Sequence, residues 1–135
     1  MGKGILIVAE HQGGKVKKPT LELLTKGKEL QATAGGDLQA VLIGSGVEGM
    51  AAELGKYGAA KVHVIDSPAL KDYNSEPYTT ALTNLIKSVQ PQIVLGSSSP
   101  LGQDLFPSVA ARLSTGVASD CTDLAISNGK LLATR

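Results

Sequence analysis

The sequence predicts a three-layer α/β fold, in which a mostly parallel, Rossmann-like sheet has helices on both faces and a β-hairpin at its C-terminal end. Short aliphatic runs alternate with segments of helical spacing along the chain. The runs are apolar at consecutive positions, which is typical of strands buried on both faces. The 135 residues are 42% hydrophobic and 19% charged, so one domain can form a core without disulfides or metal.

Four aliphatic runs are predicted strands, because each is rich in β-branched residues and is bounded by Gly, Pro, Asp or Ser. They are Gly4–Ala9, Leu38–Ile43, Val62–Ile65 and Ile93–Leu95. Helical segments lie between consecutive runs. This alternation predicts right-handed crossovers, and therefore a parallel sheet between two layers of helices.

Four segments are predicted helices, because their apolar residues recur at three- and four-residue spacing. The residues that set this spacing are Leu21, Leu24 and Leu30; then Val47, Met50, Ala51 and Leu54; then Tyr78, Leu82, Leu85, Ile86 and Val89; and finally Leu105, Val109, Ala110 and Leu113. The first helix follows Pro19 and ends at Gly35-Gly36, and the second closes near Gly58.

Polar residues and prolines predict the ends of the last two helices. Ser75 is the candidate N-cap of the third helix, and Pro91 lies beyond its end. Asp104 is the candidate N-cap of the fourth, with Pro107 in its first turn and Gly116 after it.

The last segment of the chain departs from this alternation. Asp123–Ser127 and Lys130–Thr134 flank Asn128-Gly129, which is a type I′ turn signal, so we expect an antiparallel hairpin. A strand that ends abruptly at Arg135 is typical of a chain that continues. We therefore expect residues 1–135 to form a single N-terminal α/β domain of a longer chain.

Composition excludes several classes of function. The formal net charge is +1 and the aromatic content is 3%, so neither nucleic-acid binding nor base stacking is expected. Apolar stretches are too short for a spanning helix, so membrane insertion is not expected. The single cysteine, Cys121, fits a reducing compartment. Since a strand is predicted from Gly4, we expect no signal or transit peptide and a bacterial or archaeal cytoplasm.

The first candidate motif is Gly44–Gly49, which follows a predicted strand and reads G-x-G-x-x-G. Such glycines let a backbone approach a pyrophosphate, and Asp66 would bind a ribose hydroxyl. The motif follows the second strand, whereas this fingerprint normally opens the first βα unit. Glu48 would also place a carboxylate beside a phosphate. We therefore favour a tight strand–helix turn that binds no ligand.

The second candidate motif is Gly96–Pro100, which continues to Gly102-Gln103-Asp104. A Gly/Ser loop at the carboxyl end of a strand offers donors to a phosphate, but it is equally typical of a polar turn that caps a helix. Both interpretations stay open.

Catalytic and metal-binding residues are not predicted. Cys121 has His11 and His63 as possible partners, but their spacing matches no catalytic or metal site, and we expect a half-buried His63 and a small buried Cys121. The acidic side chains at element ends are expected to cap: Glu10, Asp66, Asp104, Asp120 and Asp123. The lysines Lys15, Lys17 and Lys18 are expected in a solvated loop. We assign no catalytic, cofactor-binding or metal-binding residue.

Several stretches carry a resemblance to a known family. They are Ile5–His11, Val41–Gly46, Leu54–Val62, Asp72–Tyr78, Gly102–Pro107 and Ala110–Leu113, followed by Gly116 and Ser119-Asp120. Their order and spacing from Met1 to Arg135 resemble the N-terminal domain of the electron-transfer flavoprotein alpha subunit. This resemblance implies a sheet of the adenine nucleotide alpha hydrolase-like type.

The resemblance also implies a function. The family forms an alpha–beta heterodimer with FAD that carries electrons from flavin-dependent dehydrogenases to an acceptor, as in fatty acid β-oxidation. It implies a beta-subunit partner, an electron carrier that is not an enzyme, and FAD held mainly by the C-terminal domain, with none expected on this chain alone. The family usually has Arg where this chain has Gln103 and Ser108, and an aliphatic residue at Cys121. We expect the bidentate contacts of an arginine to be missing at the first two positions.

Two alternatives stay open. A stand-alone adenine-nucleotide-binding module of the universal-stress kind would need a glycine-rich phosphate loop. A fragment of a dinucleotide-dependent dehydrogenase would use Gly44–Gly49 and Asp66.

Overall fold

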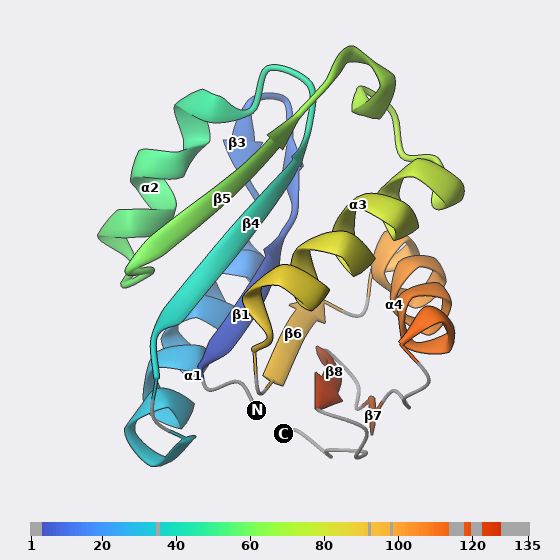
Figure 1. Cartoon of the computed structure of the whole chain (residues 1–135). Coiled ribbons are helices and arrows are strands. Elements are labelled where there is room, and N and C mark those ends of the chain that lie inside the picture. The colour runs from blue at the N-terminus through green and yellow to red at the C-terminus, as the bar shows by residue number, and fades with distance from the viewer. Residues whose placement is uncertain are drawn as a thin grey trace.

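The computed structural model describes residues 4–34, 36–91, 93–97, 99–113, 118–119 and 123–127. Their main sheet has six strands in the order β5-β4-β1-β6-β8-β7 (Figure 1). The strands are β1 (Ile5–Ala9), β4 (Leu38–Gly44), β5 (Lys61–Asp66), β6 (Ile93–Ser97), β7 (Ala118–Ser119) and β8 (Asp123–Ser127). The first four in this series pair in parallel, and β8 is antiparallel to both β6 and β7.

All four predicted strands are confirmed, each within two residues of its predicted bounds. The predicted strand Asp123–Ser127 is confirmed as well, and its observed pairing is antiparallel. Its described partners are β6 and Ala118–Ser119. The predicted turn at Asn128-Gly129 and the strand Lys130–Thr134 lie outside the described residues.

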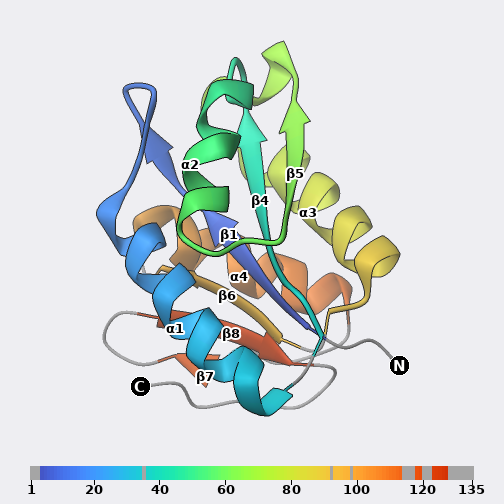
Figure 2. The ribbon, with the colours of Figure 1, turned by 90° about the vertical axis from the view of Figure 1, so that its left-hand side faces the viewer.

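Four α-helices of the described residues cover the sheet, at the four predicted places. They are α1 (Lys18–Ala34), α2 (Ala51–Lys56), α3 (Ser75–Val89) and α4 (Pro100–Arg112), with 3₁₀ turns η1 (Glu48–Met50) and η2 (Pro68–Leu70). The helices α1 and α2 lie on one face of the sheet, and α3 and α4 lie on the other (Figures 1 and 2). The predicted second helix is divided between η1 and α2.

Three predicted helix starts are wrong. The helix α1 begins at Lys18, so Pro19 lies in its first turn and does not precede it. The helix α4 begins at Pro100, and its N-cap is Ser99, whose Oγ accepts a hydrogen bond from the amide of Gly102 at 3.1 Å. Asp104 and Pro107 therefore lie inside α4. The extended backbone of Ser99 and the fixed φ of Pro100 together start the helix earlier than Asp104. At α3 the N-cap is Asn74, and Ser75 is the first helical residue.

A small hairpin replaces the predicted solvated loop near the lysines. Strands β2 (His11–Gln12) and β3 (Lys15–Val16) pair antiparallel and form the blue hairpin that projects from the sheet in Figure 2. Gly13 and Gly14 make its turn with φ of +60° and +78°, the conformation that a type I′ turn requires. The side chain of Lys15 is exposed and that of Val16 is buried.

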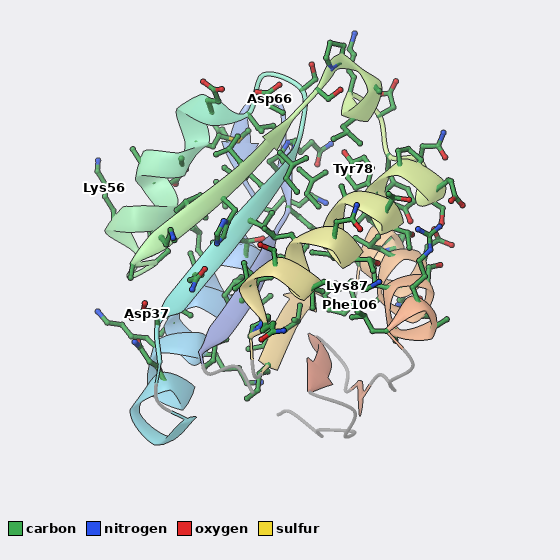
Figure 3. The ribbon with its side chains drawn as sticks, viewed as in Figure 1. Asp37, Lys56, Asp66, Tyr78, Lys87 and Phe106 are labelled. Carbon is green, nitrogen blue, oxygen red and sulfur yellow. The ribbon has the colours of Figure 1, made fainter. Side chains whose placement is uncertain are left out.

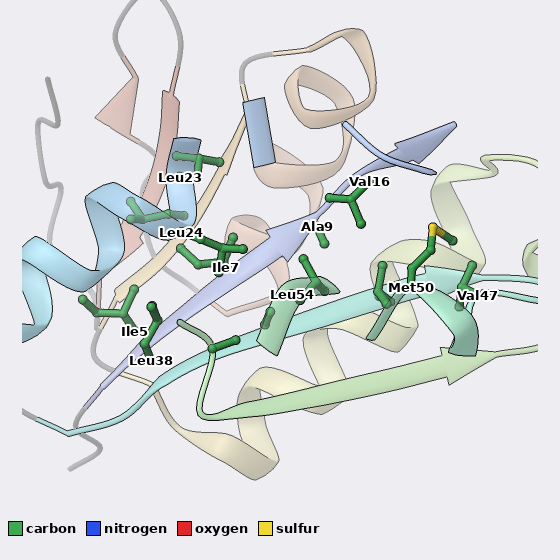
Figure 4. Close-up of a cluster of buried hydrophobic side chains, with 14 of the residues drawn as sticks. Ile5, Ile7, Ala9, Val16, Leu23, Leu24, Leu38, Val47, Met50 and Leu54 are labelled. Atoms are coloured by element: carbon green, nitrogen blue, oxygen red, sulfur yellow. The ribbon is translucent and has the colours of Figure 1, made fainter. Parts of the chain in front are cut away.

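The core has two layers, because alternate residues of β1 point to opposite faces of the sheet. Ile5, Ile7 and Ala9 pack towards α1 and α2, together with Leu24 and Leu54 (Figure 4). The other face is filled by the apolar residues Leu6, Val8, Val41, Ile43, Leu82, Ile86, Leu105, Phe106 and Val109. The parallel strands at the centre are therefore buried from both sides, as the sequence predicts.

One glycine fixes how closely α4 approaches the sheet. A Cβ at Gly96 of β6 would lie 2.3 Å from Cζ of Phe106, which is 1% exposed. A real Cβ cannot occupy that position unless the ring or the helix moves. The backbone of Gly96 is thus the floor on which the Phe106 ring, labelled in Figure 3, rests.

This contact predicts that Gly96→Ala lowers the free energy of unfolding by about 1–3 kcal/mol, since the added methyl group overpacks a closed contact. Urea denaturation measures the change. Gly49→Ala is the matched control, because a Cβ at Gly49 meets nothing within 4 Å. We expect that variant to stay within about 0.5 kcal/mol of the parent chain. Equal stability of the two variants would contradict the packing described here.

Candidate functional site

The candidate site lies at the carboxyl ends of β1, β4 and β6. Within the sheet, β4 is the neighbour of β1 on one side and β6 is its neighbour on the other. The strand order therefore changes direction at β1. In open α/β sheets, ligands bind where the strand order changes direction in this way. A cavity of about 370 Å³ opens there. It is lined by Val8, Ala9, Glu10, His11, Lys17, Ile43, Lys71, Asp72, Tyr73, Tyr78, Ser99, Pro100, Leu101 and Leu105.

Glu10 is the buried charged group of this cavity. It follows β1 directly, and its side chain is 8% exposed. The backbone of Glu10 is held by Thr20, whose Oγ1 accepts from the Glu10 amide at 2.9 Å, and by the Lys17 amide, which donates to the Glu10 carbonyl at 2.9 Å. The Lys17 Nζ lies 3.9 Å from the carboxylate Oε1. These contacts hold the carboxylate at the floor of the cavity.

Ser99 joins that carboxylate to the start of α4. Its hydroxyl donates to Glu10 Oε2 at 2.7 Å and accepts from the amide of Gly102 at 3.1 Å. The Gly96–Pro100 segment is therefore a helix-capping turn at Ser99, one of the two interpretations that the sequence left open. Because a carboxylate already lies next to this helix start, a phosphate there would meet an anion. Ser98 lies outside the described residues.

Asp66 fills the first candidate motif from the neighbouring strand. Its carboxylate oxygens accept hydrogen bonds from the amides of Gly46 and Val47, each at 3.0 Å. Figure 3 shows Asp66 at the end of β5, beside the turn that follows β4. These two amides belong to the Gly44–Gly49 turn, and amides of this kind bind pyrophosphate in the dinucleotide fingerprint. In this chain they bind a carboxylate of the chain itself.

Backbone conformation and close packing explain two of the three glycines in this turn. Gly46 has a φ of +69°, which favours glycine, and a Cβ at Gly44 would lie 2.8 Å from Val47 Cγ1 and 2.9 Å from His11 Nε2. Gly49 has neither constraint. The structure therefore supports the favoured interpretation of the motif as a tight turn, and Asp66 binds this turn instead of presenting a free carboxylate to a ribose.

Two tyrosines form one wall of the cavity. The rings of Tyr73 and Tyr78 meet edge to face, with centroids 5.0 Å apart. The Tyr78 hydroxyl donates to the Leu70 carbonyl at 2.8 Å, and the Tyr73 hydroxyl donates to the Asp104 carboxylate. Burial, followed by the hydrogen bond to Asp104 and the negative charge of that residue, raises the pKa of Tyr73 to about 12. Burial, with the charge of Asp72, also raises the pKa of Tyr78.

The two histidines lie at different places. His11 is in β2 at the cavity, and its Nε2 donates to the carbonyl of Ile43 at 3.0 Å. His63 is in β5, away from the cavity, and its Nε2 lies 2.6 Å from Oε1 of Gln39. Burial and the nearby Lys61 lower the pKa of His63. The predicted half-buried, hydrogen-bonded His63 is confirmed.

The remaining sequence-predicted residues have varied outcomes. Asp104 contacts Tyr73 from inside α4, and Ser108 donates to the Asp104 carbonyl at 3.1 Å. Gln103 is exposed on α4. Asp120 and Cys121, which were also named from the sequence, lie outside the described residues. The side chain of Asp123 does as well.

Sequence reasoning missed the cavity residues that the fold collects from distant segments. The segment that precedes α3 supplies Lys71 and Tyr73, and the first turn of α3 supplies Tyr78. The helix α4 supplies Leu101. The available signal was the presence of two of the chain's three tyrosines within this one short stretch. Among the described residues, no group of His, Cys, Asp and Glu is arranged to hold a metal ion. None of the described helices is long and apolar enough to cross a membrane.

The role of Asp66 predicts that Asp66→Asn lowers the free energy of unfolding by about 1–3 kcal/mol, because an amide offers one acceptor oxygen to two backbone donors. Urea denaturation measures this change. Asp37→Asn is the matched control, since it removes a charge from an exposed loop residue. If both variants unfold at the same urea concentration, Asp66 does not hold the turn.

The Tyr73–Asp104 contact predicts a change of stability at high pH. The pKa of Tyr73 is raised from 10.0 to about 12 in the folded chain, so the folded state favours the neutral phenol. This contribution to stability is present below pH 10.0 and is lost as the pH rises towards about 12. Tyrosine ultraviolet absorbance follows the ionisation, and Tyr73→Phe identifies its step. We expect Asp104→Asn to move the Tyr73 pKa down, and an unmoved titration would contradict the contact.

Comparison with known proteins places the chain in a family. Residues 5–135 match the family model of the electron transfer flavoprotein domain. The electron transfer flavoprotein subunit alpha of Thermoanaerobacterium thermosaccharolyticum is 40% identical over 134 residues, which cover 98% of this chain and 41% of that protein. Lactate dehydrogenase (NAD(+),ferredoxin) subunit LctC of Acetobacterium woodii is 40% identical over 122 residues, which cover 90% of this chain and 29% of that protein.

The chain thus spans about two fifths or less of the length of these curated relatives. A crystal structure of a universal stress protein in complex with cAMP matches 100% of this chain and 98% of its own, with a TM-score of 0.50 and 12% sequence identity. That likeness concerns the fold alone, and it confirms the predicted Rossmann-like fold of the adenine nucleotide alpha hydrolase-like type. The match across residues 5–135 confirms the resemblance found in the sequence: this chain belongs to the electron transfer flavoprotein domain family.

Proposed function

We propose that this chain is the N-terminal scaffold domain of an electron transfer flavoprotein alpha subunit. The complete protein would be an FAD-containing alpha–beta heterodimer that passes electrons from flavin-dependent dehydrogenases to a downstream acceptor. The family match over residues 5–135 supports this proposal. The alpha-subunit relative is matched over only 41% of its length, which leaves room for a second domain beyond the matched part.

We propose further that FAD is held mainly by that second domain. The observation that supports this placement is the pair of carboxylates at the carboxyl edge of the sheet. Asp66 accepts hydrogen bonds from the amides of the Gly44–Gly49 turn, and Glu10 accepts one from Ser99 at the start of α4. These are the two turns where a flavin pyrophosphate would find donors. The described residues therefore do not fit a flavin pyrophosphate at these turns. The same argument disfavours a stand-alone nucleotide-binding module.

A scaffold that carries no redox group needs no catalytic residue of its own. When bound in the complete protein, the flavin supplies the electron chemistry. The residues of this chain hold a rigid sheet, against which we propose that the beta subunit packs. LctC is named as part of a lactate dehydrogenase that uses NAD(+) and ferredoxin. The dehydrogenase partner therefore need not belong to fatty acid β-oxidation. We also propose a cytoplasmic location for the carrier.

Flavin and partner binding test the proposal. We expect the purified chain to be colourless and to retain no FAD after gel filtration. The same chain extended by the proposed C-terminal domain should retain FAD when it is expressed with the beta subunit. Flavin absorbance in the protein peak measures both results. Stoichiometric FAD on the 135-residue chain alone would contradict the placement of the cofactor.

The pairing is tested by mixing the chain with the beta subunit of the same organism. We expect the two proteins to elute together in gel filtration, earlier than either protein alone. The proposed heterodimer would be contradicted if the beta subunit elutes separately from this chain and also elutes separately from the extended alpha chain.

A further inference from the structure

The cavity at the carboxyl edge is lined by charged groups of both signs. Glu10 and Asp72 supply two carboxylates, and Lys17 and Lys71 supply two ammonium groups. The formal charges of these four side chains therefore cancel. The Glu10 side chain is 8% exposed, whereas Lys71 and Asp72 are exposed residues. A ligand that carries charge of one sign alone would meet a like charge in this lining.

Glu10 and Lys17 lie close together without forming a hydrogen bond. Lys17 Nζ is 3.9 Å from Glu10 Oε1, and among the described residues no other donor to this oxygen is recorded. The Lys17 side chain is 40% exposed, so its ammonium group can turn towards a bound anion. A buried carboxylate is stabilised by hydrogen-bond donors. Glu10 Oε1 is therefore suited to accept from a ligand ammonium group.

An α-amino acid matches this pair of charges, because one carbon atom carries both its ammonium group and its carboxylate. The ammonium group would donate to Glu10 Oε1, and the carboxylate would accept from Lys17. Lys71 is a second cation in the same lining. Each charge of the pair then gains a partner of opposite sign at hydrogen-bond distance, where such contacts are strong.

A phosphate group matches the lining less well. A phosphate monoester carries a charge of about −1.5 to −2 near neutral pH. It would pair with the lysines, but it would also face the carboxylates of Glu10 and Asp72. The hydroxyl of Ser99 is engaged as well, since it caps α4 and donates to Glu10. A ligand with one charge of each sign avoids this repulsion.

The apolar part of the lining suits the side chain of such a ligand. Leu101 and Leu105 come from α4, Val8 comes from β1, and the rings of Tyr73 and Tyr78 meet edge to face. Aromatic rings pack favourably in such arrangements. The volume of about 370 Å³ lies within the range of about 300–1,000 Å³ that small-molecule sites occupy. A large side chain would fill this space better than a small one.

We propose that this cavity binds a free α-amino acid with a large apolar side chain. Its ammonium group donates to Glu10, its carboxylate accepts from Lys17, and its side chain contacts the apolar wall. The proposal goes beyond the scaffold role and does not depend on where the flavin is held.

Isothermal titration calorimetry of the 135-residue chain with L-phenylalanine and three analogues tests the proposal. The analogue 3-phenylpropionate lacks the ammonium group, L-phenylalaninamide lacks the carboxylate, and L-alanine lacks the ring. We expect saturable binding of phenylalanine and binding of each analogue that is about tenfold weaker or less.

Three outcomes of this titration would overturn the proposal. The first is the absence of saturable phenylalanine binding. The second is equal affinity for phenylalanine and 3-phenylpropionate, because Glu10 would then not bind the ammonium group. The third is binding of AMP that is tenfold tighter than binding of phenylalanine, because a phosphate would then be preferred to an amino acid.

Variants locate the two charged contacts. Glu10→Gln keeps an oxygen for the Ser99 hydroxyl and removes the charge, and we expect phenylalanine and 3-phenylpropionate to bind this variant equally. We expect Lys17→Met to bind phenylalanine and its amide equally. Glu22→Gln and Lys18→Met, the same changes at exposed residues of α1, are the matched controls and should bind as the parent does.

Phenylalanine binding that is unchanged in both Glu10→Gln and Lys17→Met would overturn the proposal. The melting temperature of each variant shows that it is folded during the titration. If either variant unfolds, the analogue series on the parent chain still decides the question, because it removes the same charges from the ligand.

Discussion

The carboxyl edge of this sheet depends on carboxylates that accept hydrogen bonds from the chain itself. Asp66 at the end of β5 accepts from two amides of the turn after β4, at 3.0 Å each. These contacts join the edge strand to its neighbour and hold the turn that leads into α2. Glu10 does similar work at the end of β1, where Ser99 connects its side chain to the first turn of α4. Negative charge at helix starts is favourable, and here it comes from inside the fold.

Close packing sets the positions of these carboxylates. Alternate residues of β1 fill two separate core layers, so both layers fix the strand from which Glu10 extends. On one face, the Phe106 ring lies on the backbone of Gly96, which fixes the distance between α4 and the sheet. Ser99 reaches Glu10 only because α4 begins where this packing places it. The geometry of the edge is therefore a consequence of the core.

The strands could be predicted from the sequence because runs such as Ile5–Ala9 are apolar throughout, as expected of strands that are buried on both faces. The start of α4 was placed wrongly because Ser99-Pro100 and Asp104 both offer local helix-start signals. In the structure Ser99 caps the helix, and its hydroxyl also donates to Glu10, 89 residues away. The sequence pattern singled out Gly44–Gly49 and Asp66 as parts of one candidate site. It did not predict that Asp66 accepts hydrogen bonds from the amides of that turn. The cavity was missed because its residues meet only in the folded chain.

The central claim is that these backbone donors are already occupied, so that no phosphate binds at this edge of the sheet. Nuclear magnetic resonance of the amides of Gly46, Val47 and Gly102 during a titration with inorganic pyrophosphate tests it most directly. The account predicts that the three amide signals stay where they are, apart from the small uniform drift that added salt produces. A saturable movement confined to these amides would show that pyrophosphate displaces the Asp66 carboxylate or the Ser99 hydroxyl from them, and would contradict the account.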